Sequence, residues 1–212
     1  HNGVLDSGFG VSGLRVLHQP NFGFSQHQIV WCEPDSVIVP SGSGVVVFAN
    51  CFPTEAMHIY SEIFAFRLNA HGDADSSFGS GGVTRIRVGT SPHLFYGNGG
   101  TAAPIPGGGW IAALKGLGPG ASTHGVMVRL PADGTADRTF GSNGVSPIHS
   151  TDLWWQRPLA DPLVASDGSF YYVFRDYSNS SSCTSISKTS PDGSLDQAFG
   201  SAGYMMTCGD GW

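Results

Sequence analysis

The sequence is poor in charge and has no long apolar run. Only 12% of its 212 residues are charged, with 10 Lys plus Arg against 16 Asp plus Glu, which gives a net charge of −6. So few basic residues cannot neutralise a row of phosphates, so we expect no nucleic-acid partner. No apolar segment approaches the roughly 20 residues that cross a bilayer as a helix, so we also expect no membrane insertion.

Recognisable catalytic motifs are also missing. The chain has no GxSxG, no HExxH, no phosphate loop and no dinucleotide fingerprint. Its cysteines form no CxxC pair and its histidines share no ligand spacing, so we predict no metal and no cofactor. Glu55 or Glu62 with Asp152 would supply the two carboxylates of a glycosidase, which keeps a secreted polysaccharide-acting enzyme as an alternative.

The four cysteines, Cys32, Cys51, Cys183 and Cys208, favour two disulfides in a secreted or cell-surface protein. Three pairings are possible. We favour Cys32–Cys51 and Cys183–Cys208, because each bridge then closes a loop of about 20–25 residues near one end of the chain. Four free buried thiols in a cytosolic protein are the alternative.

Glycine is abundant, with 31 residues, and 40% of the chain is hydrophobic. That apolar share argues against disorder, and the length suits a single domain over residues 1–212. Much of the glycine belongs to the motif G-x-x-D-x-x-F-G-x-x-G, which starts at residues 3, 72, 134 and 193. The motif divides the chain into units at 3–71, 72–133 and 134–192, with a partial fourth at 193–212.

The motif has the chemistry of a turn. Its glycines allow positive φ, its Asp can accept a bond from a nearby backbone N–H, and its Phe can anchor the turn to the core. A basic residue, Arg67, Arg129 or Lys188, stands eight positions before the Asp of the last three motifs, which predicts a structural ion pair. The motif residues are Asp6 and Phe9, Asp75 and Phe78, Asp137 and Phe140, and Asp196 and Phe199.

Short extended segments separate the motifs and predict four strands per unit. One strand follows each motif, a hairpin comes next, and a fourth strand enters the next motif. The first strands are expected at Leu14–Leu17, Val83–Val88 and Val145–Ile148, with Tyr204–Thr207 opening a fourth, incomplete unit. The polar segment Cys183–Lys188 is expected as an edge strand. The sequence thus predicts an all-β, propeller-like array of three four-stranded antiparallel units.

The segment Phe66–Gly72 with Asp75–Val83 resembles the delta-60 repeat of bacterial secreted and surface proteins. The resemblance covers nearly the whole chain and implies a β-propeller-like, extracellular protein, but little about activity. Closed propellers usually have four to eight blades. Three units therefore suggest a homo-oligomer or part of a longer chain.

Irregular loops at the end opposite the motifs are rich in aromatic residues and histidine. Such loops on a rigid scaffold often bind ligands, although aromatic loop residues also fold back into small cores. Adjacent tryptophans in extended chain cannot both face the core, and exposed rings suit sugars. The candidate ligand-binding residues are His18, Trp31, His93, Tyr96, Trp154, Trp155 and Arg157. We therefore expect a non-catalytic recognition or adhesion module for carbohydrate or a surface protein, with a structural array unit as a further alternative.

Overall fold

The structure is a computed structural model. It describes residues 4–16, 31–32, 37–52, 62–87, 100–114, 126–147, 156–178 and 181–209. Within these ranges the chain forms 14 β-strands and no helix, which confirms the predicted all-β class.

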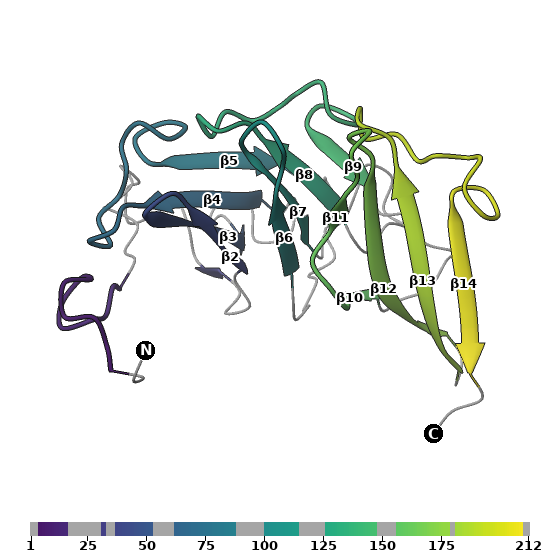
Figure 1. Cartoon of the computed structure of the whole chain (residues 1–212), viewed down its shortest axis with the longest axis horizontal. Helices are drawn as coiled ribbons and strands as arrows, with labels where there is room; N and C mark the ends of the chain where they lie inside the picture. The colour runs from purple at the N-terminus through teal and green to yellow at the C-terminus, as the bar shows by residue number, and fades with distance from the viewer. Residues whose placement is uncertain are drawn as a thin grey trace.

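The strands form three antiparallel sheets that follow one another along the chain (Figure 1). The first sheet contains β1 (Trp31–Cys32), β2 (Val37–Ser41), β3 (Gly44–Phe52), β4 (Glu62–Leu68) and β5 (Val83–Arg87). The second contains β6 (Gly100–Pro104), β7 (Trp110–Leu114), β8 (Val126–Leu130) and β9 (Val145–Pro147). The third contains β10 (Gln156–Pro158), β11 (Leu163–Val164), β12 (Phe170–Ser178), β13 (Ser181–Thr189) and β14 (Tyr204–Gly209).

Each sheet is four strands wide, as predicted. In the first sheet, the short strands β1 and β2 both pair with β3, and in the third, β10 and β11 both pair with β12. Over the part of the chain that the structure describes, none of the sheets closes into a barrel. Figure 1 shows the three sheets along an arc, with the first motif in purple at its left end and β14 in yellow at its right end.

The hydrogen-bonded sheets are offset by one strand from the sequence repeat. β5, β9 and β14 each follow a motif, and each pairs with the strand that precedes that motif. The segment Tyr204–Thr207 therefore pairs as the last strand of the third sheet. The motif is the corner between the last two strands of each sheet.

Two other strand predictions differ from the structure. The segment Cys183–Lys188 lies in β13, between β12 and β14, and is not an edge. Its small polar residues are buried opposite bulky ones, with Ser187 paired with Tyr172 and Ser185 with Phe174. The expected strand at Leu14–Leu17 is absent over residues 14–16, where Leu14 makes only an isolated bridge to Val11. The other strands that follow a motif pair with a strand before it, and the described residues offer Leu14 none.

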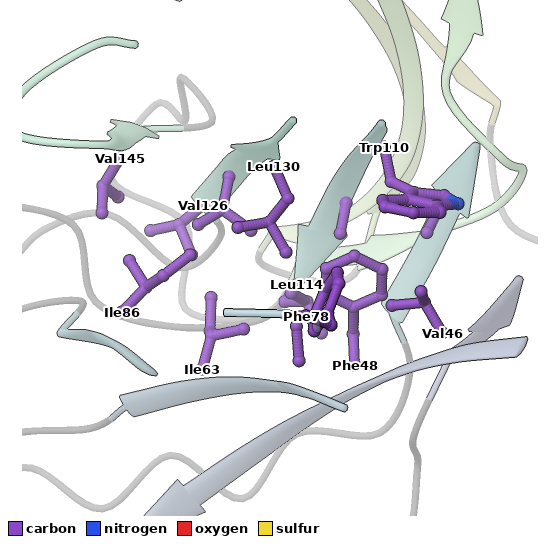
Figure 2. Close-up of a cluster of buried hydrophobic side chains, with 14 residues drawn as sticks. Val46, Phe48, Ile63, Phe78, Ile86, Trp110, Leu114, Val126, Leu130 and Val145 are labelled. Carbon is purple, nitrogen blue, oxygen red and sulfur yellow. The ribbon is translucent and has the colours of Figure 1, made fainter. Parts of the chain in front are cut away.

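A continuous core joins the first two sheets. Ile63 and Ala65 of β4 face Ala112 and Val128 of the second sheet, and all four are fully buried. Figure 2 shows Ile63 and Ile86 reaching from the first sheet towards Val126 of the second. The other face of β4 carries Phe64, Phe66 and Leu68, which pack with Phe9 of the first motif. Because both faces are covered, β4 is apolar along nearly its whole length.

The second and third sheets pack in the same way. Ile111, Ala113 and Met127 from the second sheet meet Phe170, Tyr172 and Phe174 of β12. The opposite face of the third sheet differs, because several of its apolar side chains are exposed. They include Leu163, Ile186 and Met205.

The hairpin turns and the motif turns lie at the same end of the sheets, as predicted. Gly108 lies beside Ala132, and Gly168 lies beside Pro191, so each hairpin contacts the segment that enters the following motif. The segments that the structure describes contain no helix long and apolar enough to cross a membrane.

Candidate functional site: the interlocked turns

All four motifs adopt one backbone conformation. The N–H of the motif Phe donates to the carbonyl of the motif Asp, with N–O distances of 2.9 to 3.1 Å, and the N–H of the last Gly donates to the Phe carbonyl at 2.8 to 2.9 Å. Wherever the fixed glycines fall in the described ranges, their φ values lie between 56° and 95°. L side chains rarely adopt this conformation, so the turn explains the fixed glycines.

The motif Asp uses its two carboxylate oxygens for two separate tasks. In the second motif, Oδ1 of Asp75 accepts the Ser77 N–H at 3.1 Å, which closes an Asx turn, and Oδ2 accepts Nε of Arg67 at 2.9 Å. Asp137 binds Thr139 and Arg129 in the same way. The third pair is Lys188 with Asp196, at 2.8 Å. The pairing therefore follows the eight-residue offset in the sequence.

These contacts lower the pKa of the motif carboxylates. Hydrogen bonds from the Ser77 hydroxyl and N–H, together with Arg67, hold the pKa of Asp75 below its ordinary value. Burial alone would raise the pKa of Asp137, but the bonds from Thr139 and Arg129 outweigh it and the pKa is lowered. Lys188 and the Ala198 N–H lower the pKa of Asp196. These carboxylates are therefore ionised and engaged at neutral pH, which suits a structural role.

Each turn also binds the next turn along the chain. The N–H of the Gly that follows the motif Phe donates to a carbonyl just before the next motif, from Gly10 to His71, from Gly79 to Asp133 and from Gly141 to Asp192, at 2.6 to 2.8 Å. A side chain adds a second bond, from the Thr84 hydroxyl to the Gly134 carbonyl and from the Ser146 hydroxyl to the Gly193 carbonyl. We call each such contact between successive motifs a junction.

The paired arginine reaches across the same junction. Nη1 of Arg67 donates to the Ala132 carbonyl at 3.0 Å, and Nη1 of Arg129 donates to the Pro191 carbonyl. Each guanidinium also lies over the ring of its motif Phe, 5.1 Å from the centre of Phe78 for Arg67. A planar group with several donors can make all these contacts at once. Each arginine therefore ties together its own turn, its own Phe and the following unit.

The motif Phe is covered by the next unit. Phe78 and Phe140 are fully buried, and their rings meet Trp110 and Phe170 edge-on, the first residues of β7 and β12. At the last motif the arrangement changes. Lys188 replaces the arginine, and Phe199 meets Tyr171 of its own sheet and is only half-buried.

The predicted ligand-binding residues fall almost wholly outside the described residues. These are His18, His93, Tyr96, Trp154 and Trp155. The backbone places Trp31 in β1 opposite Phe52 and Arg157 in β10 opposite Arg175. Both positions pair with the ends of β3 and β12 that lie away from the hairpin turns.

Of the candidate glycosidase carboxylates, only Glu62 is described, and it is already paired. Glu62 is buried, and one of its oxygens accepts both Nε and Nη2 of Arg85, at 3.1 and 2.7 Å. A carboxylate bound in this way is not positioned to protonate or attack a substrate. Glu55 and Asp152 lie outside the described residues. No group of His, Cys, Asp or Glu within the described ranges is arranged to hold a metal ion.

The structure confirms one of the two favoured disulfides. Cys183 and Cys208 lie directly opposite each other on β13 and β14 and are bonded, with their Cα atoms 4.1 Å apart. Cys32 and Cys51 are also directly opposite in the β1–β3 pair, which is the register that the second bridge requires, but their side chains lie outside the described part.

The turn-to-turn contacts were only partly visible in the sequence. The Asp and its basic partner are local and have a fixed spacing, but Thr84 and Ser146 act on a carbonyl in the following unit. Their common position, nine residues after the motif Asp, is the signal that would have identified them. Comparison of the chain with family models, curated proteins and solved structures finds no match.

Proposed function

We propose that this chain is a non-catalytic recognition module of an extracellular protein that binds carbohydrate through the loops opposite its motif turns. The observation that carries the proposal is the division of roles between the two ends of the sheets. At the turn end, the polar groups of each motif hold one unit to the next, as Arg67, Asp75 and Thr84 do. The side chains that differ between units are then expected in the loops at the other end, where they can bind a ligand.

The proposal includes a propeller-like arrangement of delta-60-type repeats. Its support is that β6, the first strand of the second sheet, contacts both β2 of the first sheet and β10 of the third. Neighbouring first strands are expected when sheets are arranged around a common axis. The Cys183–Cys208 bridge supports an extracellular setting, because disulfides persist mainly in oxidising compartments.

Arginine and tryptophan at the loop end favour a sugar that carries a carboxylate. The backbone places Arg157 in β10, opposite β12. A guanidinium group is suited to bidentate recognition of a carboxylate, and tryptophans offer flat faces to sugar rings. Trp154 and Trp155 immediately precede β10 in the sequence.

A glycan array that contains neutral and carboxylate-bearing sugars tests the proposal. We expect the folded protein to bind acidic glycans, and Arg157→Ala or the double change Trp154→Ala with Trp155→Ala to weaken binding at least about tenfold. Arg138→Ala is the matched control, because Arg138 is exposed at the turn end. A folded wild-type protein that binds no glycan, or loop variants that bind as well as the control, would overturn the proposal.

A further inference from the structure

The three junctions in the chain share one polar contact that the last motif lacks. The second residue of the strand segment after each motif reaches the following turn. Arg15 pairs with Asp73 at 3.6 Å, Thr84 binds the Gly134 carbonyl and Ser146 binds the Gly193 carbonyl at 2.5 Å. In the fourth motif this position is Met205, which has no donor and is 55% exposed.

Two other groups of the fourth motif match the earlier junctions, but the described residues supply no following turn for them to bind. Gly200 corresponds to Gly10, Gly79 and Gly141, yet its N–H has no carbonyl acceptor within the described ranges. Phe199 is half-buried, like Phe9 of the first motif, whereas Phe78 and Phe140 are fully buried. In each junction, the earlier motif is the leading half and the later motif is the trailing half. The fourth motif therefore has the groups of a leading half, but the described part of the chain supplies no trailing half for it.

The first motif is the opposite case. As the leading half of the first junction it is engaged, through Gly10 and Arg15. Among the described residues, none covers its trailing side. Leu5 and Leu14, which correspond to the junction residues Ala136 and Val145, are 71% and 64% exposed. In the second junction, Ala136 packs against the core that joins the first two sheets, and Val145 is part of it.

In two internal junctions the corresponding side chains lie together in a groove. Thr84 and Ala136 line one groove between successive turns, and Ser146 and Leu195 line the next. At the free halves, Met205 stands in place of the hydroxyl, and Leu5 stands where these two junctions have Ala136 or Leu195. Met205 and Leu5 are both apolar and exposed, so burying them together removes apolar surface from water on both sides.

We infer that the fourth motif of one copy binds the first motif of a second copy, with Met205 against Leu5, as an end-to-end repeat of the internal junction. The contact is heterologous, so it builds chains of copies or closes them into a ring. This inference goes beyond glycan recognition and does not depend on it. A repeat whose outer face remained free in solution would be expected to have a polar outer face, whereas Leu163, Ile186 and Met205 are exposed on this one.

Light scattering of the purified protein from micromolar to millimolar concentration tests the inference. We expect the wild-type mass to rise above that of the monomer with concentration, and Leu5→Lys and Met205→Lys each to weaken association at least about tenfold. Both side chains are exposed, so neither change disturbs the fold, and circular dichroism checks this. Leu159→Lys is the matched control, because Leu159 directly follows β10, is 47% exposed and belongs to no motif.

Mixing the two variants distinguishes end-to-end binding from pairing of identical faces. Met205→Lys retains a normal first motif and Leu5→Lys retains a normal fourth motif, so an equal mixture should form a complex of twice the monomer mass that grows no further. A monomeric wild type at all concentrations would overturn the inference. So would a Leu5→Lys variant that still associates like the wild type, because that result would indicate contact between identical third-sheet faces.

Discussion

The ring of Phe78 lies directly against the α-carbon of Gly134, which belongs to the next repeat unit. The same relationship joins Phe140 to Gly193, where an added Cβ would lie 3.0 Å from the ring and 2.6 Å from the Gly141 nitrogen. The first glycine of each of the last three motifs thus has two reasons to be glycine, a positive φ and the aromatic ring of the preceding motif.

Comparison of alanine substitutions at Gly134 and Gly81 separates the cost of the positive φ from the cost of the ring contact. In Gly134→Ala the new methyl group collides with Phe78, and the φ of 77° is also unfavourable for alanine, so we expect unfolding to become easier by about 2–3 kcal/mol. Gly81→Ala is the control, since φ is 65° there but nothing lies within 4 Å of the added Cβ. We expect it to cost only about 1 kcal/mol. Urea unfolding of both variants measures the difference, and equal losses would show that the ring contact is unimportant.

The arginine at each internal junction cannot be exchanged freely for lysine. Arg129→Lys keeps the charge next to Asp137 but removes the fork that also reaches the Pro191 carbonyl, so we expect a loss of about 1 kcal/mol in the free energy of unfolding. The reciprocal Lys188→Arg should change stability by less than about 0.5 kcal/mol, because the described residues supply no following turn to bind. A loss of similar size in both variants would indicate that the ion pair alone matters.

The local features of the fold were predictable from the sequence because they repeat at fixed spacing. The Asx turn at Asp75 and the ion pair of Arg129 with Asp137 need only residues within one motif and the strand before it. The contacts between units were not predictable in this way. Nothing local to Thr84 shows that its hydroxyl binds a carbonyl 50 residues away.

The strand assignments failed where pairing depends on the neighbouring unit. The polarity of β13 suggested an edge, but Ser185 and Ser187 are small enough to be buried under Phe174 and Tyr172 of β12. Leu14 lies in an extended pattern, yet it has no strand to pair with in the described residues. Polarity alone does not distinguish an edge strand from one that packs small residues against large ones.

The motif carboxylates should make the protein sensitive to acid. The folded-state pKa values of Asp75, Asp137 and Asp196 are below 3.8, so the stability that they contribute is present above that value and is lost as the pH falls through the folded pKa values. The free energy of unfolding should therefore decline on acidification below about pH 4. In Asp75→Asn the stability at neutral pH should be lower and the decline smaller. Thermal unfolding of the wild type and of Asp75→Asn across the acid range measures the decline. If stability falls in parallel with pH in both proteins, Asp75 does not contribute to the acid sensitivity.

Removal of the Cys183–Cys208 bridge should release β14 first. The side chains of Met205, Met206 and Cys208 are exposed, so β14 is held by its pairing with β13 and by the disulfide rather than by burial. The bridge spans 25 residues, and replacing both cysteines with serine should lower the free energy of unfolding by about 3 kcal/mol on the loop-entropy model.

Thr184 and Thr207 are the next opposed pair, so Thr184→Ser with Thr207→Ser is the control without loss of a covalent bond. Hydrogen exchange should show faster exchange of the β14 amides in the variant with both cysteines replaced, and not in the threonine-to-serine control. Unchanged protection of β14 would mean that strand pairing is sufficient, and the fourth motif would then keep its position for the end-to-end contact even under reducing conditions.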